Sequence, residues 1–363
     1  MLETLATHFE NNLPFVAYRK PNATAINVIF QHDDALHEVS DFTESGFIFA
    51  PFDATQQAVL IPFEDVQQTI IETIPAPKAS SISEYISAEA HQKHINLVQK
   101  GVDAIQNSVI TKVVVSRKEE VVTDKSPFVL FQQLLTTYET AFVYIWYHPK
   151  VGMWLGATPE TLVHAKGSTF ATMSLAGTRK FEEGVVVSWN EKEIDEQQIV
   201  TDYIVNRLQN VTTNVRVTKA ATHQAGSIVH LRSMISGRIS PTVNIGDIIT
   251  TLHPTPAICG FPTDIAKAFI LQEETYDRTF YTGYLGELNV KEETSRNRNR
   301  KNQENSAYRT VRSNSELYVN LRCMELTDRK ATLYIGGGIT KDSNPESEWQ
   351  ETLAKSQIMK RVL

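Results

Sequence analysis

The chain has 363 residues, about two to three typical domain lengths, although large sheet-rich proteins reach this size as a single domain. Hydrophobic residues make up 41% and charged residues 21%, a composition too apolar for a disordered chain. The 35 lysines and arginines stand against 42 aspartates and glutamates, and the net charge of -7 argues against a nucleic-acid partner that needs a broad basic face. An anionic ligand must therefore be met by local cations or by a metal ion.

Two features of the sequence set the expected compartment. The first residues, Met1–Thr4, contain neither a basic nor an apolar targeting region, and no later run approaches the roughly 18 apolar residues of a membrane span. The two cysteines, Cys259 and Cys323, are too few for a disulfide framework or a cysteine-based zinc site. We therefore expect a cytoplasmic protein that contacts no membrane, with both thiols in the core.

The pattern of apolar runs predicts a sheet-rich chain. Residues 1–85 alternate short apolar runs with proline and asparagine, which predicts a strand-rich scaffold. A proline- and serine-rich stretch at 75–81 is typical of a linker, and a helix is expected at about 84–107. Beyond it the patterns predict a helix at 127–137 and strands at 112–122, 142–148, 151–156, 161–165, 281–290, 316–326 and 331–336. Many strands at hairpin-like spacing, mixed with several helices, predict an α+β fold with mainly antiparallel sheet.

The segment 291–305 differs from the rest because Arg296, Arg298, Arg300 and Lys301 alternate with asparagine and serine. Such a segment could serve as an anion-binding arm. A solvated loop that joins two strands is favoured, because no aromatic residues are interleaved with the charges.

The strongest chemical signal is a carboxylate pair that occurs twice. Glu193 and Glu196 are three residues apart, and Val200, Tyr203 and Ile204 continue the same helical stripe. Two carboxylates therefore lie on a helix face that becomes apolar one turn later.

The second pair, Glu348 and Glu351, has the same spacing, and Lys355 continues its stripe. Asn344 is placed to cap this helix and Pro345 to be its first residue. Two helices that each turn a carboxylate pair inward would form an oxygen-ligand site suited to Mg²⁺, which keeps waters and shares its remaining positions with an anionic substrate. Each pair taken singly also fits a solvated helix face, because glutamate is rarely fully buried.

Two further residues have acid–base potential. Lys112 begins the run KVVVSR, and a lysine partly desolvated among valines can have its pKa lowered enough to act as a general base. Glu160 ends GATPE, just after a proline-fixed turn, where a positioned general acid is often found. A surface lysine at a strand start, and a glutamate placed by the helix dipole, fit the same patterns.

Glycine turns supply possible anion contacts, at 174–179 (SLAGTR) and 336–340 (GGGIT). Glycine allows a ligand to approach the backbone N–H groups closely. Neither run matches a P-loop or a dinucleotide-binding fingerprint.

These motifs, taken together and in this order, resemble those of the chorismate-utilising enzymes, which include isochorismate, anthranilate, aminodeoxychorismate and salicylate synthases. The resemblance covers about residues 90–363 and rests on KVVVSR at 112–117, GATPE at 156–160, SLAGTR at 174–179, the acidic helix ending in IV at 199–200, HLRS at 230–233, LHPTPAICGFP at 252–262, YTG at 281–283, LRC at 321–323, GGGI at 336–339 and EWQET at 348–352. It implies a large, mainly antiparallel β-sheet core flanked by helices, as in anthranilate synthase component I. Residues 90–363 would form the chorismate-binding catalytic region, and residues 1–85 a divergent N-terminal part of the same fold.

The resemblance also implies a reaction. Family members that add ammonia typically have glutamine at the position of Lys112, whereas members that add water have lysine. Ala176 stands where aminodeoxychorismate synthases carry a nucleophilic lysine, so their covalent route is closed. PTPAICGFP is similar to the string in isochorismate synthases. The implied activity is Mg²⁺-dependent isomerisation of chorismate to isochorismate, in which Lys112 deprotonates the water that attacks C2 and Glu160 protonates the departing C4 hydroxyl.

The family match implies roles for the other site residues. These roles are metal binding for Glu196 and Glu351, ordering of the metal's waters for Glu193 and Glu348, contact with the enolpyruvyl carboxylate for Tyr281 and Arg322, an anion cradle for Gly177, Thr178, Gly337 and Lys355, and a pocket wall for His253, Ala257 and Ile258. His230 fits either a substrate contact or a satisfied core histidine. Gln197 departs from the histidine that the family commonly has after the metal-binding glutamate.

Two alternatives remain open at this stage. A salicylate synthase would make isochorismate and then eliminate pyruvate from it, and a catalytically silent protein would bind chorismate without turnover. The presence of Lys112 and Glu160 argues against the silent protein. No amidotransferase subunit is expected because water needs none, and we expect a monomer or weak dimer. The sequence does not indicate whether the product serves menaquinone, siderophore or salicylate formation.

Overall fold

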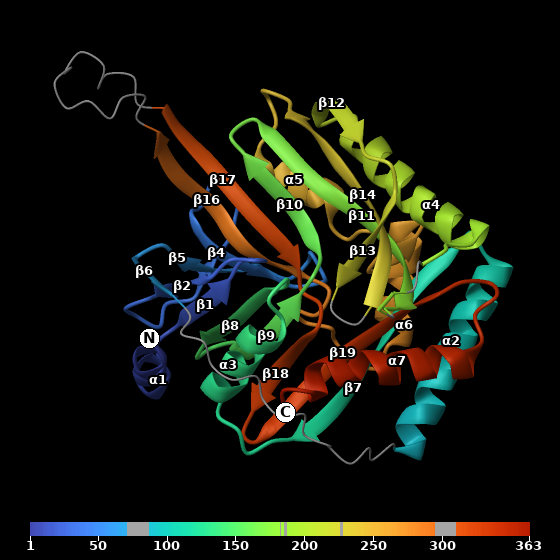
Figure 1. The fold of residues 1–363 in the computed structure, drawn as a ribbon, viewed down its shortest axis with the longest axis horizontal. Helices are drawn as coiled ribbons and strands as arrows, with labels where there is room; N and C mark the ends of the chain where they lie inside the picture. The colour runs from blue at the N-terminus through green and yellow to red at the C-terminus, as the bar shows by residue number, and fades with distance from the viewer. Residues whose placement is uncertain (71–86, 182, 185–186, 226–227, 295–309) are drawn as a thin grey trace.

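The computed structural model describes residues 1–70, 87–181, 183–184, 187–225, 228–294 and 310–363. Within these ranges the chain forms seven helices and two large sheets, and every strand pairing is antiparallel. The predicted α+β class, with a mainly antiparallel sheet core flanked by helices, is confirmed (Figure 1). No helix in the described part is long and apolar enough to cross a lipid bilayer.

The two sheets have nine and ten strands. The strand order in the first sheet is β15 (Gly260–Phe261), β7 (Lys112–Val122), β19 (Lys330–Ile339), β18 (Cys323–Thr327), β9 (Gly152–Thr158), β8 (Phe142–His148), β1 (Phe15–Arg19), β2 (Ala25–Phe30) and β6 (Asp65–Ile70). The order in the second sheet is β12 (Thr212–Val217), β14 (Ile228–Ile239), β11 (Thr169–Lys180), β10 (Thr161–Lys166), β17 (Thr310–Val319), β16 (Tyr284–Thr294), β4 (Gly46–Ala50), β5 (Val59–Pro62) and β3 (His37–Glu38), with β13 (Ala221–Ala225) also paired to β14.

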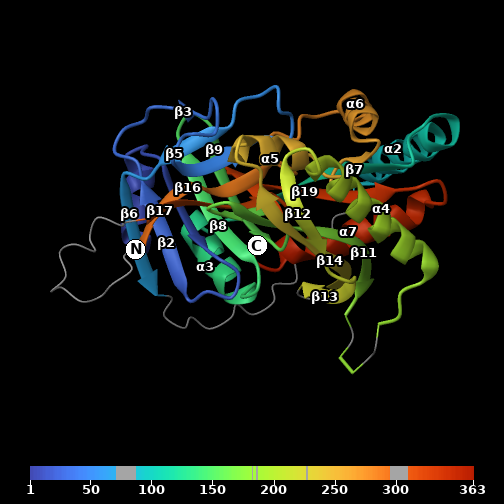
Figure 2. The ribbon, with the colours of Figure 1, turned by 90° about the horizontal axis from the view of Figure 1, so that it is seen from above.

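The bounds of the described helices are α1 (Leu2–Glu10), α2 (Ala88–Asn107), α3 (Pro127–Thr137), α4 (Glu191–Leu208), α5 (Ile245–Leu252), α6 (Thr263–Glu273) and α7 (Pro345–Lys360). Five of the seven described helices, all except α1 and α6, begin after a residue whose side chain accepts a hydrogen bond from a backbone N–H of the first turn. The predicted start of α7 is confirmed, since the Asn344 side chain accepts a hydrogen bond from the Ser347 N–H and Pro345 is the first helical residue. In both views α2, α4, α6 and α7 lie at the end of the molecule opposite the N-terminal strands (Figures 1 and 2).

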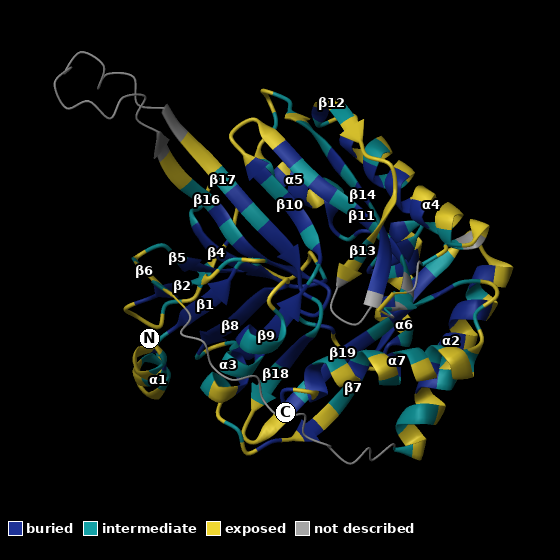
Figure 3. Ribbon diagram, viewed as in Figure 1, coloured by how far each residue is buried: buried dark blue, intermediate teal, exposed yellow. Residues whose placement is uncertain are grey.

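The two sheets pack face to face through a cluster of large aromatic side chains. The rings of Phe142 in the first sheet and Tyr318 in the second stack with centroids 4.2 Å apart, and those of Trp146 and Phe49 lie 5.0 Å apart. Helices α1, α3 and α7 cover the outer face of the first sheet, and α4 and α5 that of the second. The core therefore has four layers, and buried residues concentrate in the strands, whereas exposed residues lie on the outer helix faces (Figure 3).

The N-terminal residues supply strands to both sheets. β1 pairs with β8 in the first sheet, and β4 pairs with β16 in the second. The expected linker at 75–81 lies outside the described residues, and the division of the chain between residues 85 and 90 stays a prediction. Of the basic segment 291–305, only the first residues are described, as the end of β16; β16 and β17, which flank it, pair with each other.

Two expectations about local structure were wrong. A helix, α1, occupies residues that the apolar runs assigned to a strand-rich scaffold. The expected strand at 316–326 is two strands in different sheets, because β17 ends at Val319 and β18 begins at Cys323. Arg322, in the break, has a φ of 50°, a left-handed conformation that no strand accommodates.

The described chain passes from one sheet to the other at six places, and two of these crossings lie side by side. This break is the first of the two. The second lies between β9 and β10, at Pro159 and Glu160. The two crossings hydrogen-bond to each other, since the Val319 N–H donates to the Glu160 carbonyl over 3.0 Å and the Ala157 N–H donates to the Arg322 carbonyl over 3.0 Å. Glu160 and Arg322 are therefore fixed side by side, 162 positions apart in the sequence.

Asn320 holds the crossing between β17 and β18 in place. Its fully buried amide donates to the Phe280 carbonyl over 2.9 Å and accepts from the Tyr144 hydroxyl over 2.7 Å. Its backbone also exchanges hydrogen bonds with Thr282 and Gly283. One side chain thus ties both sheets to the segment before β16.

We expect the Asn320→Ala variant to lose about 2 to 4 kcal/mol of unfolding free energy, because it leaves the buried Tyr144 hydroxyl without its partner and removes one of the two donors to the Phe280 carbonyl. Urea unfolding measures this loss. The control Asn314→Ala removes an asparagine whose amide, among the described residues, donates to the exposed Glu292 alone, and it should cost less than about 0.5 kcal/mol. Equal losses in the two variants would contradict this role for Asn320.

Candidate active site

A cavity of about 230 Å³ lies between the two sheets, bordered by α4 and α7. Its wall takes residues from β7, β11, β14, β19 and both chain crossings. The residues predicted from sequence that line it are Glu160, Gly177, Glu196, Ala257, Ile258, Tyr281, Arg322, Glu351 and Lys355, together with His230. Segments far apart in the sequence therefore converge on one site.

Glu160 is the most perturbed acid in this cavity. Its side chain is buried, and no ion pair within the described residues reaches it. Burial raises the pKa of Glu160 to about 7, against the opposing effect of the Arg322 and Lys112 charges. A carboxyl group with this pKa holds a proton for about half of the time at neutral pH, which suits a general acid.

Lys112 approaches the cavity from the first residue of β7. Its ammonium group lies 2.7 Å from the Glu196 carboxylate, and 13% of its side chain is exposed. A Cβ at Gly338, on the neighbouring β19, would come within 3.1 Å of the Lys112 Cε. Glycine at that position therefore leaves the space that the lysine side chain needs.

Arg322 and Tyr281 form the cationic and phenolic part of the wall. Within the described residues the Arg322 guanidinium makes no hydrogen bond or ion pair with another side chain, although burial lowers its pKa. The Tyr281 ring stacks on Tyr334 at 5.4 Å, and its hydroxyl would lie 2.7 Å from a Cβ at Gly336. The pair offers five N–H donors and one hydroxyl to a carboxylate.

The second carboxylate group of the cavity lies on α7. Lys355 bonds to Glu351 over 2.6 Å and donates to the Gly336 carbonyl over 3.0 Å. Burial alone would raise the pKa of Glu351, but the Lys355 charge and the more distant cations lower it. Burial, together with the charges of Glu351 and Glu196, raises the pKa of Glu348. These three carboxylates therefore interact with one another.

The donor set fits a hard divalent cation. Glu196 and Glu351 face the same cavity from different helices, and Glu348 lies close enough to interact with both. The described residues contain no group of three His, Cys, Asp or Glu side chains already arranged around one ion position. Mg²⁺ commonly takes only one or two carboxylates and keeps several waters, so two facing glutamates meet its requirements.

Glu193 does not line the cavity. Its carboxylate accepts from the Asn190 N–H in a capping box at the start of α4 and makes a two-pronged pair with Arg179, at 2.8 and 2.5 Å. Arg179 lowers its pKa. The helical spacing brought Glu193 and Glu196 to one face, but the unpaired N–H groups of the first turn hold the earlier glutamate outside the cavity wall.

The other predicted residues are distributed around the site. Gly177 has a φ of 68°, and its carbonyl bonds to His230, whose pKa burial lowers to about 4. Gly337 faces Glu348, which would lie 3.6 Å from a Cβ there. The structure places His253 at the end of α5, packed on Tyr284 and outside the cavity wall. The Thr178 side chain lies outside the described residues.

Gln197 takes a structural place behind the cavity. It is buried, and its amide nitrogen lies within hydrogen-bond distance of Ser174 on β11, of Thr201 and of Ser233 on β14, at 2.9 to 3.0 Å. These contacts hold α4 against the second sheet and thereby fix the position of Glu196, the residue before Gln197. Gln197 thus faces the second sheet, whereas Glu196 faces the cavity.

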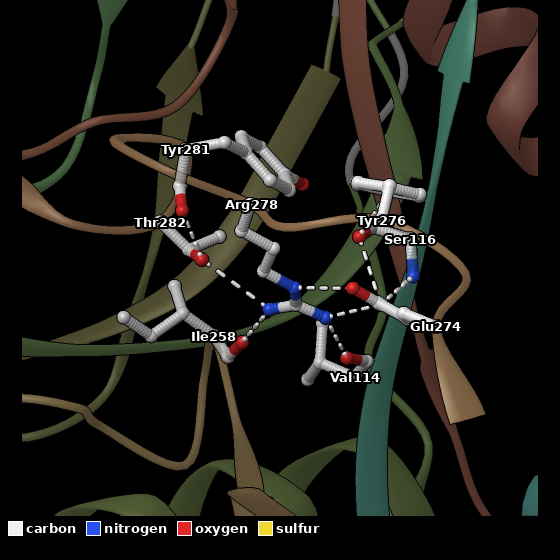
Figure 4. A network of polar contacts seen from close by, with 8 residues as sticks. All are labelled: Val114, Ser116, Ile258, Glu274, Tyr276, Arg278, Tyr281 and Thr282. Atoms are coloured by element: carbon white, nitrogen blue, oxygen red, sulfur yellow. Dashed lines mark hydrogen bonds and ion pairs between the residues drawn. The ribbon is translucent and has the colours of Figure 1, made fainter. Parts of the chain in front are cut away.

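Sequence reasoning missed a buried ion pair beside the cavity, Glu274 and Arg278 (Figure 4). The acid and base are four residues apart just before the motif at 281–283, and this spacing was the available signal. Burial alone would lower the pKa of Arg278, but the Glu274 carboxylate raises it.

The motifs and the cavity agree with a comparison to known families. A family model described as chorismate binding enzyme matches residues 50–295 and 308–363. The chain belongs to the chorismate-binding enzyme family. Isochorismate synthase DhbC of Bacillus subtilis is 32% identical over 219 residues, which are 58% of this chain and 50% of that protein, so the match spans half the length of this relative. The family predicted from the motifs is confirmed.

Two solved structures share the architecture. DhbC from Bacillus anthracis superposes with a TM-score of 0.78 at 21% identity, covering 100% of this chain and 99% of the other. Anthranilate synthase component I from Streptococcus pneumoniae gives a TM-score of 0.69 at 20% identity, covering 96% and 92%. At these identities the likeness shows the fold, and it confirms the expected anthranilate synthase component I-like core.

We expect Glu160 to make the protein less stable as the pH rises from about 4.5 to 7. Across this range the folded chain holds a proton that the unfolded chain, with an ordinary carboxyl, has released, so stability falls with rising pH. The Glu160→Gln variant should be more stable than the wild type by up to about 3 kcal/mol at pH 8 and equally stable at pH 4. Urea unfolding of both proteins over this range measures the difference, and a difference that does not change with pH would contradict the shifted pKa.

Proposed function

We propose that the protein is an isochorismate synthase that converts chorismate to isochorismate with Mg²⁺. The observation that carries this proposal is the presence of two groups at one cavity: a buried carboxyl in the wall with a pKa of about 7, and a lysine at the start of β7 whose ammonium group bonds to the wall residue Glu196. A reaction that removes one proton and adds another needs a base and an acid, and different surroundings can give two groups these two roles. The names of the relatives agree with this reaction.

The proposed reaction involves two proton transfers, one to Lys112 and one from Glu160. Lys112, in its uncharged form, takes a proton from the water that attacks C2 of the ring. Glu160 gives its proton to the C4 hydroxyl, which leaves as water while the ring double bonds shift. One water enters and one leaves, so the product is an isomer, and a proton returning from Lys112 to Glu160 through solvent restores both groups.

The substrate is a dianion, and the cavity supplies cations for both carboxylates. Arg322 and Tyr281 would hold the enolpyruvyl carboxylate, since the guanidinium has donors to spare among the described residues. Lys355 and the backbone N–H groups near Gly177 and Gly337 would contact the remaining polar groups. Ala257 and Ile258 form an apolar wall against the ring.

Glu196 and Glu351 would hold Mg²⁺, with Glu348 reaching it through water. The bound ion would supply positive charge to the ring carboxylate, which a protein of net charge -7 otherwise lacks. In the structure each of these two glutamates is paired with a lysine, Lys112 or Lys355. These lysines hold the carboxylates in place.

Water is the proposed nucleophile, so no ammonia-supplying subunit is required. Lys112 stands where ammonia-adding members of the family have glutamine, and Ala176 cannot form the covalent intermediate of aminodeoxychorismate synthases. Elimination of pyruvate to give salicylate is the competing outcome.

The deciding experiment incubates the purified protein with chorismate and Mg²⁺ and separates the products by liquid chromatography. We expect isochorismate, no pyruvate above the uncatalysed background, and loss of turnover when a chelator removes the metal. Salicylate with an equal amount of pyruvate would identify the competing activity. Binding of chorismate without turnover would overturn the proposed roles of Lys112 and Glu160.

We expect the Lys112→Gln variant to lose about 10²- to 10⁴-fold in kcat, because an amide can still donate to Glu196 but cannot accept a proton from water. Its melting temperature checks that the fold is kept. The matched control is Lys330→Gln on β19, the strand next to β7, where the lysine pairs with the exposed Glu120. Its kcat should match the wild type, and a Lys112→Gln variant with wild-type kcat would exclude the general-base role.

A further inference from the structure

We infer that the buried pair Glu274–Arg278 positions three segments of the cavity wall for catalysis. The inference rests on the proposed function for its kinetic consequences, while the contacts that support it belong to the structure alone.

One guanidinium reaches three separate parts of the wall (Figure 4). Arg278 donates to the Val114 carbonyl over 2.7 Å, to the Ile258 carbonyl over 3.2 Å and to the Thr282 hydroxyl over 3.3 Å. All three of these residues line the cavity. They come from β7, from the segment before β15 and from the segment before β16. β7 already bonds to the segment that contains Ile258, through the Val114 N–H and the Cys259 carbonyl, and Arg278 ties both of them to the segment before β16.

Each of these contacts lies next to a residue with a proposed role. Val114 is two residues from Lys112 on the same strand, and alternate strand residues share a face. Thr282 follows Tyr281 directly, and Ile258 is itself part of the apolar wall. A shift of the guanidinium would therefore move the base, the phenol and the wall relative to one another.

Glu274 fixes the guanidinium from the other side. It accepts from Arg278 over 2.8 and 2.6 Å, and from the Ser116 N–H and hydroxyl over 2.7 and 2.8 Å. Both charged side chains are only 2% exposed, and the guanidinium lies 4.6 Å from the Phe52 ring. Its orientation is therefore set by hydrogen bonds on two edges and by a ring on one face.

A role in holding the cavity wall rigid explains the Glu274–Arg278 pair better than a contribution to the stability of the fold alone. Replacing a buried ion pair by neutral groups of similar size is often neutral or stabilising, because the pair loses its hydration on folding. The pair is also neutral as a unit, so it adds no net charge to the site. Neutral groups cannot reproduce the planar Arg278 guanidinium, which bonds to three segments of the cavity wall at once.

The test uses the double variant Glu274→Gln/Arg278→Met, which removes both charges together and leaves no buried charge unpaired. The matched control is Asp53→Asn/Lys267→Met, which removes an ion pair of 2.9 Å between Asp53, after β4, and Lys267 on α6. Neither of these two residues lines the cavity. Because Lys267 also lies near the Phe52 ring, the control keeps the surroundings comparable.

With chorismate and Mg²⁺, the Glu274→Gln/Arg278→Met variant should keep its fold, as judged by thermal melting, and lose about 10²-fold in kcat with a smaller change in KM. The control should stay within about twofold of the wild type. If the double variant does not fold, Arg278→Lys replaces it, and about a tenfold loss of kcat is expected because lysine cannot make the three-way contact. A folded variant with wild-type kcat would overturn the inference.

Hydrogen exchange provides a readout that needs no turnover. In the folded double variant, amides of residues 112–116 and 257–259 should exchange faster than in the wild type, while the α3 and β8 amides keep their protection. Unchanged exchange in both wall segments would overturn the inference even if the wild type proved inactive on chorismate. An inactive wild type with faster exchange in the variant would reject the proposed function and keep the positioning role.

Discussion

A charged group that lies between two packed sheets is stabilised by a partner of opposite charge, and this constraint shapes most of the site. Lys112 on the first sheet meets Glu196 on a helix that covers the second, and Lys355 meets Glu351 along α7. Removing one partner of such a pair leaves a buried charge without compensation, which costs far more than the pair contributes. The sheets and helices around the cavity are therefore held in one register by their charges as well as by their aromatic core.

Glu160 is the exception that gives the site its chemistry. Among the described residues it has no ion-pair partner, so burial dominates its pKa, whereas Lys355 lowers the pKa of Glu351, which lines the same cavity. Similar carboxyl groups thus differ in protonation because their surroundings differ. The crossing between β9 and β10 places Glu160 in the interior, where no lysine of the described residues forms an ion pair with it.

The sequence predicted the elements between residues 112 and 166 most closely, because the strands there have strong apolar patterns and clear turns. Several strands and α3 begin and end at the expected residues, among them β7 and β8. It missed α1, whose pattern is short, and it joined β17 to β18 because the apolar run continues through Asn320. Nothing local indicates that Asn320 receives its partners from residues 144 and 280.

The candidate site was predicted through motifs, and the structure brings most of those motifs to one cavity. The equal spacing of the two glutamate pairs could not tell a capping glutamate from one that faces the cavity, and Glu193 is the capping one. Gln197 and the Glu274–Arg278 pair act behind the wall, where the partners are carbonyls and hydroxyls from distant strands. Such contacts carry no pattern along the chain.

The central claim is that Lys112 and Glu160 exchange protons with water that enters at C2 and leaves from C4. Running the reaction with unlabelled chorismate in H₂¹⁸O and analysing isochorismate by mass spectrometry tests this claim directly. The account predicts one ¹⁸O atom per isochorismate, at the C2 hydroxyl, from the first turnover. Isochorismate without the label would mean that the original hydroxyl moves within the substrate, and it would contradict the assigned roles of both residues.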